Sequence, residues 1–134
     1  MAEDSGQSVM STLDTHILPL VPGLREGLEH GIRVLDAGCG RGRVLNRLAE
    51  LYPRSRFVGV DLSREATAFA RDEAAAHGLG NVEFLSLDLS NFDETAEPDA
   101  FDVVATFDAI HDQAKPLGVL KGIYRTLKRD GVYL

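Results

Sequence analysis

A run of three alternating glycines most constrains this chain. Gly38, Gly40 and Gly42 follow a short apolar stretch at residues 34–35 that leads into Asp36. Glycine adopts positive φ at little cost and has no Cβ, so a ligand can approach its backbone closely. A helix is expected directly afterwards, because apolar residues recur there at helical spacing. They are Val44, Leu45, Leu48 and Leu51. The pattern predicts a strand, a tight ligand-binding turn and a helix.

The spacing of the glycines differs from that of the dinucleotide fingerprint. G-x-G-x-x-G places its third glycine three positions after the second. Arg43 occupies that position here, and the observed order is D-x-G-x-G-x-G. An NAD-dependent oxidoreductase therefore remains as the weaker hypothesis.

Two further acidic residues follow predicted strands. Asp61 comes directly after the apolar run 56–60, and Asp88 follows the run 82–85. A carboxylate at Asp61 can accept hydrogen bonds from both ribose hydroxyls of an adenosine. Because several cofactors contain adenosine, Asp61 alone does not identify the ligand.

Together these motifs resemble the class I S-adenosylmethionine-dependent methyltransferases. The resemblance covers roughly residues 32–134, and it implies S-adenosylmethionine as the cofactor. It implies that Asp61 holds the ribose and that Asp88 hydrogen-bonds the adenine amine. Leu89 then offers its backbone N–H to the ring, and Leu62 lies against an adenine face; a simple core role is the alternative for Leu62.

The same resemblance assigns the methionine end of the cofactor to the glycine turn. Asp36 anchors the turn and reaches the methionine amino group through water, while the backbone of Gly38, Cys39 and Gly40 contacts the ligand. Phe107 flanks the transferable methyl group, because residues 101–108 resemble the fourth motif of the family.

His111 is the candidate catalytic residue. It follows the predicted fourth strand, where the reaction zone is expected. Histidine changes its charge near neutral pH, which suits a general base for an acceptor hydroxyl or amine. A surface or helix-capping histidine is the alternative. No metal site is indicated, because the acids stand at separate strand ends without a local His/Cys cluster.

Strands that alternate with helices predict an α/β fold with a parallel sheet covered on both faces. The resemblance implies a Rossmann-like, doubly wound sheet of order 3-2-1-4-5 in residues 32–134, and a helical cap segment in residues 1–31. The family's last two strands would be missing, so a fragment of a longer protein is expected. Residues 106–113 also resemble a subgroup in which a winged-helix domain precedes this one.

Helix signals fix several expected boundaries and faces. Ser63 is a good N-cap, and Gly78 a good stop, for the helix between them. A short helix carries Leu24 and Leu28, and residues 91–100 form a loop or a short irregular helix. The last helix is expected to bury one apolar face, and residues 127–134 resemble the helix-turn-strand of the family that leads into a fifth strand. That face comprises Leu117, Leu120, Tyr124 and Leu127, with Ile123 beside it.

Composition disfavours several kinds of partner. The formal net charge of −7 disfavours nucleic acid, which needs clustered Lys and Arg. One cysteine cannot form an internal disulfide, and no apolar run reaches the roughly 18 residues of a membrane span. We therefore expect a cytoplasmic protein without a membrane partner.

The predicted function is methyl transfer from S-adenosylmethionine to a small-molecule acceptor. A non-catalytic module that binds S-adenosylmethionine or S-adenosylhomocysteine is the first alternative, and an NAD-dependent oxidoreductase the second. An unpaired fifth strand would expose backbone groups, so we also expect a homodimer or an exchanged strand through residues 131–134.

Overall fold

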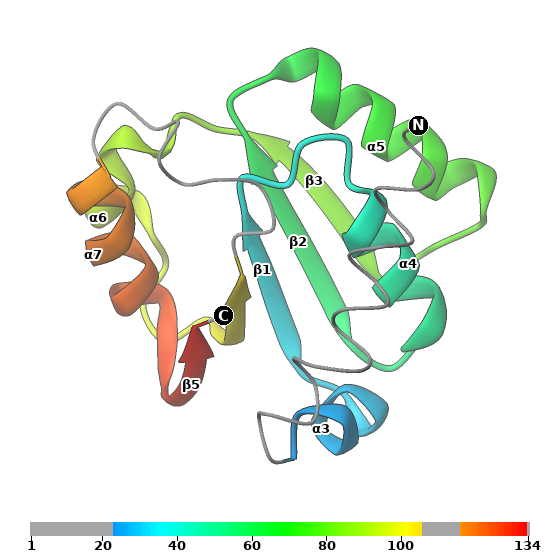
Figure 1. The fold of residues 1–134 in the computed structure, drawn as a ribbon, viewed down its shortest axis with the longest axis horizontal. Helices are drawn as coiled ribbons and strands as arrows, with labels where there is room; N and C mark the ends of the chain where they lie inside the picture. Colours follow the sequence, from blue (N-terminus) through cyan, green and yellow to red (C-terminus); the bar gives the residue numbers. More distant parts are fainter. Residues whose placement is uncertain (1–22, 106–115, 134) are drawn as a thin grey trace.

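The computed structural model describes residues 23–105 and 116–133. Its sheet is parallel and has the order β3-β2-β1-β4-β5, which confirms the predicted fold class (Figure 1). The strands are β1 (Arg33–Ala37), β2 (Arg56–Asp61), β3 (Val82–Ser86), β4 (Phe101–Ala105) and β5 (Leu127–Tyr133).

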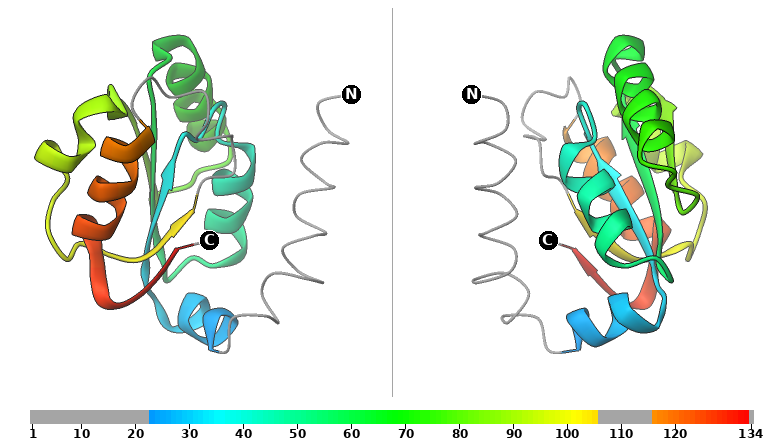
Figure 2. Two further views of the ribbon diagram at one scale, coloured as in Figure 1. Left: turned by 60° about the vertical axis from the view of Figure 1, so that its left-hand side comes forward. Right: turned by 90° about the vertical axis from the view of Figure 1, so that its right-hand side faces the viewer.

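Helices cover both faces of the sheet (Figure 2). Those before β3 are α3 (Leu24–His30), α4 (Arg43–Leu51) and α5 (Arg64–Ala76). Those after it are the 3-10 helix η2 (Leu89–Asn91), α6 (Phe92–Thr95) and α7 (Pro116–Thr126). None of the helices in the described ranges is long and apolar enough to cross a membrane.

The apolar strands supply a separate core to each face. Neighbouring residues of a strand point to opposite faces. Val34 accordingly lies in the cluster under α3, α4 and α5, and Leu35 lies in the cluster under α6 and α7. Val103 and Val104 of β4 divide in the same way. The strands read as nearly continuous apolar runs because both of their faces are buried.

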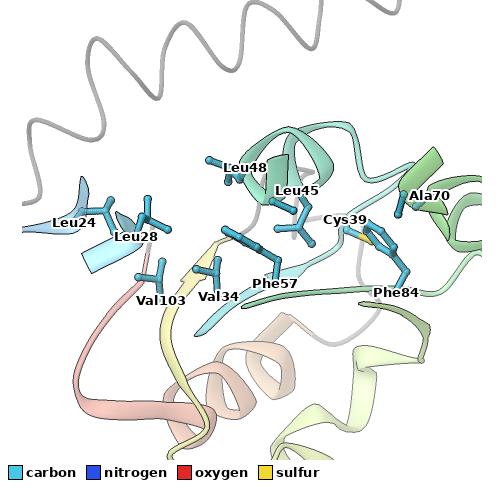
Figure 3. Close-up of a cluster of buried hydrophobic side chains, with 12 residues drawn as sticks. Leu24, Leu28, Val34, Cys39, Leu45, Leu48, Phe57, Ala70, Phe84 and Val103 are labelled. Atoms are coloured by element: carbon cyan, nitrogen blue, oxygen red, sulfur yellow. The ribbon is translucent and has the colours of Figure 1, made fainter. Parts of the chain in front are cut away.

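The core under α4 and α5 forms around two phenylalanines of the sheet. Phe57 and Phe84 are each 1% exposed. Figure 3 shows them beneath Leu45 of α4 and Ala70 of α5. Leu51 was expected on the buried face of α4 but is 48% exposed. It is the last residue of the helix, where the chain turns away toward β2.

The core under α7 only partly matches the expected helix face. Val119 and Ile123 are fully buried, whereas Leu117 and Tyr124 of the predicted apolar face are 65% and 71% exposed. The reason is Gly122: a Cβ on this residue would overlap the ring of Phe92, so α7 turns its small residues toward α6 and η2. Leu120 and Leu127 of the predicted face do lie in this core, as does Ile123, so the prediction is wrong only for Leu117 and Tyr124.

The fifth strand is present, and its pairing with β4 is interrupted by a bulge. Leu127 pairs with Phe101 and Val132 pairs with Val103, so residues 128–131 stand opposite Asp102 alone. β5 follows α7 directly and pairs with β4. It is the last strand in the order of the described sheet.

The predicted short helix at Leu24 and Leu28 is confirmed as α3. Both leucines are buried in the core shared with α4 and α5. The rest of the proposed N-terminal cap, residues 1–22, lies outside the described residues, so a separate cap segment over residues 1–31 stays a prediction.

Candidate functional site

Three acidic residues lie at the carboxyl ends of β3, β2 and β1, which are parallel neighbours in the sheet. Asp61 is the last residue of β2, and Asp36 is next to last in β1. Asp88 follows β3 by two positions. The carboxyl ends of neighbouring strands are where ligands bind in open α/β sheets. The topology thus gathers residues that are far apart in the sequence.

The glycine turn between β1 and α4 is attached to the end of β2. Gly38 and Gly40 have φ of 104° and 56°, values that favour glycine. The N–H groups of Gly38 and Cys39 both donate to the carbonyl oxygen of Val60, at 2.8 and 2.9 Å. In Figure 1 this loop arches over the end of β2. The turn is therefore ordered by its neighbouring strand.

Asp61 completes this attachment with its side chain. Its Oδ2 accepts the N–H of Gly40 at 2.9 Å, and its Oδ1 accepts the N–H of Ser63 at 2.9 Å. Both carboxylate oxygens are thereby oriented at the end of β2. Each carboxylate oxygen can accept more than one hydrogen bond, so the group keeps acceptor capacity for a diol.

Asp88 and Leu89 begin the 3-10 helix η2. Asp88 is exposed, and its Oδ1 accepts the N–H of Ser90 at 2.9 Å, which caps η2. Leu89 is 1% exposed, so its side chain belongs to the core on the α7 face. The buried Leu89 side chain fixes the position of this turn, and the exposed Asp88 carboxylate beside it can accept hydrogen bonds from a ligand.

Asp36 is 1% exposed at the end of β1. It lies between Gly59 of β2 and Ala105 of β4 in the sheet register. A buried carboxylate is costly in free energy unless it is paired or hydrogen-bonded. The residues around Asp36, including the turn that follows it, must therefore accommodate this group. The water-mediated contact with methionine that the resemblance implies stays a prediction.

Cys39 and Gly42 pack into the protein beneath the turn. The Cys39 side chain is 7% exposed and lies beside Phe84 (Figure 3). Gly42 has a φ of 72°, and a Cβ on it would lie 2.6 Å from the Phe84 ring and 2.8 Å from the Cβ of Ala70. The third glycine of the motif thus makes room for protein atoms.

Gly59 is a residue of this region that the sequence analysis passed over. A Cβ there would lie 2.8 Å from the Phe84 ring and 2.9 Å from the Cys39 sulfur. A glycine inside a strand often marks a place where another part of the chain approaches the backbone closely. The glycine within the apolar run 56–61 was therefore a usable sequence signal. The carbonyl of Val60 carries no such signal, because any residue could supply it.

Leu62 and Arg41 stand on the outer side of the site. Leu62 is 64% exposed directly after Asp61, which suits an apolar surface for a planar base. The guanidinium of Arg41 lies over the Phe69 ring of α5, 5.0 Å from its centroid. Phe107 and His111 lie outside the described residues, so their predicted roles remain untested.

The arrangement suits a ligand without a pyrophosphate. Phosphate sites use backbone N–H groups that point at the anion. Here the N–H groups of Gly38, Cys39 and Gly40 already donate to a carbonyl and a carboxylate. Carboxylates at three strand ends favour hydroxyls, amines and cationic groups. The described residues contain no group of three or more His, Cys, Asp or Glu side chains able to hold a metal ion.

Comparison with known proteins agrees with this chemistry. The profile of a family described as "Methyltransferase domain" matches residues 28–134. The ubiquinone biosynthesis O-methyltransferase of Neisseria meningitidis is 30% identical over 103 residues, which cover 76% of this chain and 42% of that protein. The chain thus spans less than half the length of this curated relative.

Solved structures share the fold. A SAM-dependent methyltransferase from Aquifex aeolicus has a TM-score of 0.68 at 25% identity, and the match covers 92% of this chain and 67% of that one. The [4+2]-cyclase SpnF also has a TM-score of 0.68, at 30% identity, with 75% and 36% covered. Because the family profile spans most of the sequence, the chain belongs to the methyltransferase-domain family, whose members use S-adenosylmethionine.

Proposed function

We propose that the protein transfers a methyl group from S-adenosylmethionine to a small-molecule acceptor. One observation carries the proposal: Asp61 and the glycine turn are joined at the end of β2, with Asp36 and Asp88 at the ends of the two adjacent strands. That set of acceptors matches a nucleoside joined to a cationic amino acid. The net charge of −7 supports a small acceptor over nucleic acid.

Each residue then has a defined binding task. Asp61 accepts the ribose hydroxyls, and Leu62 covers one face of the base. Asp88 accepts the adenine amine, and the Leu89 N–H reaches the ring. The methionine end lies against Asp36 and the backbone of Gly38, Cys39 and Gly40.

The chemical demand on the protein is small. Bound S-adenosylmethionine supplies an electrophilic methyl group on a sulfonium. The chain needs to hold the acceptor in line with that methyl and to exclude water. His111 takes the proton from the acceptor hydroxyl or amine, and Phe107 flanks the methyl.

Isothermal titration calorimetry tests the cofactor assignment. We expect saturable binding of S-adenosylmethionine and S-adenosylhomocysteine and none of NAD. Asp61→Ala and Asp88→Ala should each weaken binding roughly ten- to one-hundred-fold, because each removes hydrogen bonds to a charged acceptor. Asp72→Ala, an exposed acid on α5, is the matched control and should bind normally. Saturable NAD binding without a response to the sulfur compounds would overturn the proposal.

Catalysis is tested separately with a methyl-labelled cofactor and a panel of small acceptors. His111→Ala should lower kcat while cofactor affinity stays unchanged. The similarity to a protein described as a [4+2]-cyclase favours a second candidate, in which the cofactor binds but no methyl is transferred. Tight cofactor binding with no turnover of any acceptor would support that candidate.

The remaining proposals concern assembly and location. β5 lies at an end of the described sheet, and an unpaired edge invites a second strand. We propose a homodimer that forms through residues 131–134. Sedimentation at high protein concentration tests it, and a single monomeric species would refute it. A cytoplasmic location is supported by the single cysteine.

A further inference from the structure

Asp61 and Asp88 form the same local turn, and Asp61 also binds the glycine turn. In each case Oδ1 accepts the backbone N–H two residues ahead, from Ser63 and Ser90, at 2.9 Å. Asp61 additionally accepts the N–H of Gly40 through Oδ2, also at 2.9 Å and across 21 positions of sequence. A ribose ligand alone does not require that long-range bond.

The bond closes a series of three contacts between the glycine turn and β2. Val60 takes the N–H groups of Gly38 and Cys39, and the next residue, Asp61, takes that of Gly40. The first two contacts use a backbone carbonyl that any residue would provide. The third depends on an acidic side chain, so it is the contact that a substitution can remove.

The third contact is also the strongest in kind. A hydrogen bond to a carboxylate is about twice as strong as one between neutral groups. It holds Gly40 at a φ of 56°, in the left-handed region. A half-buried position limits the competition from water. Asp61 therefore stabilises the turn before any ligand arrives.

We infer that Asp61 is a positioning residue for the glycine turn, in addition to the ribose contact of the proposed function. The two N–H groups orient its carboxylate, and its remaining acceptor capacity faces the ligand. A site ordered in advance loses less freedom when the ligand binds. The ribose contact and the ordered turn are thus coupled through one side chain.

Amide hydrogen exchange in the cofactor-free protein tests this role. In the wild type the Gly40 amide should be protected like those of Gly38 and Cys39. Asp61→Ala should accelerate exchange at Gly40 roughly ten- to one-hundred-fold, while Gly38 and Cys39 stay protected by the Val60 carbonyl. Those two amides report that the variant is folded.

Two further variants sharpen the test. Asp61→Asn supplies one acceptor and one donor, so it can satisfy Gly40 or Ser63 but not both, and one of these amides should lose protection. Asp88→Ala is the matched control: it also removes a predicted cofactor ligand and an Oδ1 turn bond. It should leave exchange at Gly40 unchanged.

The outcomes separate this inference from the proposed function. An unprotected Gly40 amide in the wild type would overturn the positioning role, and so would unchanged exchange at Gly40 in a folded Asp61→Ala protein. Neither result depends on S-adenosylmethionine. Conversely, a protein that binds no S-adenosylmethionine but shows the predicted exchange would refute the proposed function and keep the positioning role.

Discussion

On one face of the sheet the start of α4 meets β3 and α5 at Gly42, and on the other face α7 meets α6 at Gly122. Both glycines remove a side chain where two elements approach closely. They differ in backbone: Gly42 has a φ of 72°, whereas Gly122 lies inside a helix. Gly42 is therefore needed both for its positive φ and for the close approach, whereas Gly122 is needed for the close approach alone. Replacing each glycine by alanine compares the two requirements.

The comparison teaches how a glycine in a ligand-binding motif should be interpreted. Gly42 belongs to the turn that holds the candidate site, yet the atoms that exclude a Cβ there are those of Phe84 and Ala70. Its place in the motif is thus explained by the packing of the start of α4 against β3 and α5. Gly38 and Gly40 are the members whose backbone N–H groups bond to β2.

Gly42→Ala should have the largest effect on stability. The substitution combines an unfavourable left-handed φ with a clash against a fully buried ring, so we expect a loss of about 2 to 5 kcal/mol in the free energy of unfolding. Urea denaturation measures it. Gly78→Ala is the matched control, because Gly78 has a φ of 66° with nothing within 4 Å. Its loss should be about 1 kcal/mol. Equal losses at the two positions would contradict the packing role of Gly42.

Gly122→Ala should have a smaller, net destabilising effect. Alanine favours the helix by about 1 kcal/mol, but its Cβ would overlap Phe92 and approach the Phe92 backbone, which cannot easily move. We expect a net loss of about 1 to 2 kcal/mol. Gly27→Ala in α3 meets only Ile32, at 3.5 Å, and should instead gain about 0.5 to 1 kcal/mol. A stabilised Gly122→Ala protein would show that α7 can shift away from α6.

Thr126→Val should stabilise the α7 face by about 1 kcal/mol. The Thr126 side chain is 1% exposed, and among the described residues its Oγ1 has no hydrogen-bond partner. A buried hydroxyl without a partner costs free energy that a methyl group of similar shape does not. Thermal denaturation checks the gain. A destabilised variant would reveal a partner for the hydroxyl.

Arg41→Ala should have the smallest effect. The guanidinium lies over Phe69 at the protein surface, where such contacts contribute about 0.5 to 1 kcal/mol. Arg41→Lys keeps the charge and tests whether the planar group matters. A loss well above this range, measured by urea denaturation, would mean that Arg41 holds the glycine turn more firmly than its exposed position suggests.

Features that depend on neighbours along the chain were predictable from the sequence. Ser63 caps α5 as expected, with its Oγ accepting the Ala66 N–H at 3.1 Å. Gly78 takes the left-handed conformation just after that helix. The apolar runs became strands, and the alternation with helices made them parallel. The strand-end position of Asp61 followed from these local signals.

Features that depend on contacts between distant segments were not predictable in the same way. The close approach of Gly122 to Phe92, a residue on another element, turns Leu117 and Tyr124 away from the core, so apolar spacing predicted the buried face of α7 only in part. The bond between Asp61 and Gly40 required the turn to fold back over β2. The spacing of two small residues, Gly118 and Gly122, was the available signal for the buried face of α7. No local pattern indicated the bond between Asp61 and Gly40.

The most direct test of the central claim is a titration of the protein with S-adenosylhomocysteine, followed by amide chemical shifts. The account predicts saturable shifts at residues 36–42, 61–63 and 87–90, where the carboxyl ends of β1, β2 and β3 meet. Arg33 and Asn81, at the opposite ends of strands, should not move. Shifts confined to the amino ends of the strands, or no saturable response while NAD produces one, would contradict the account.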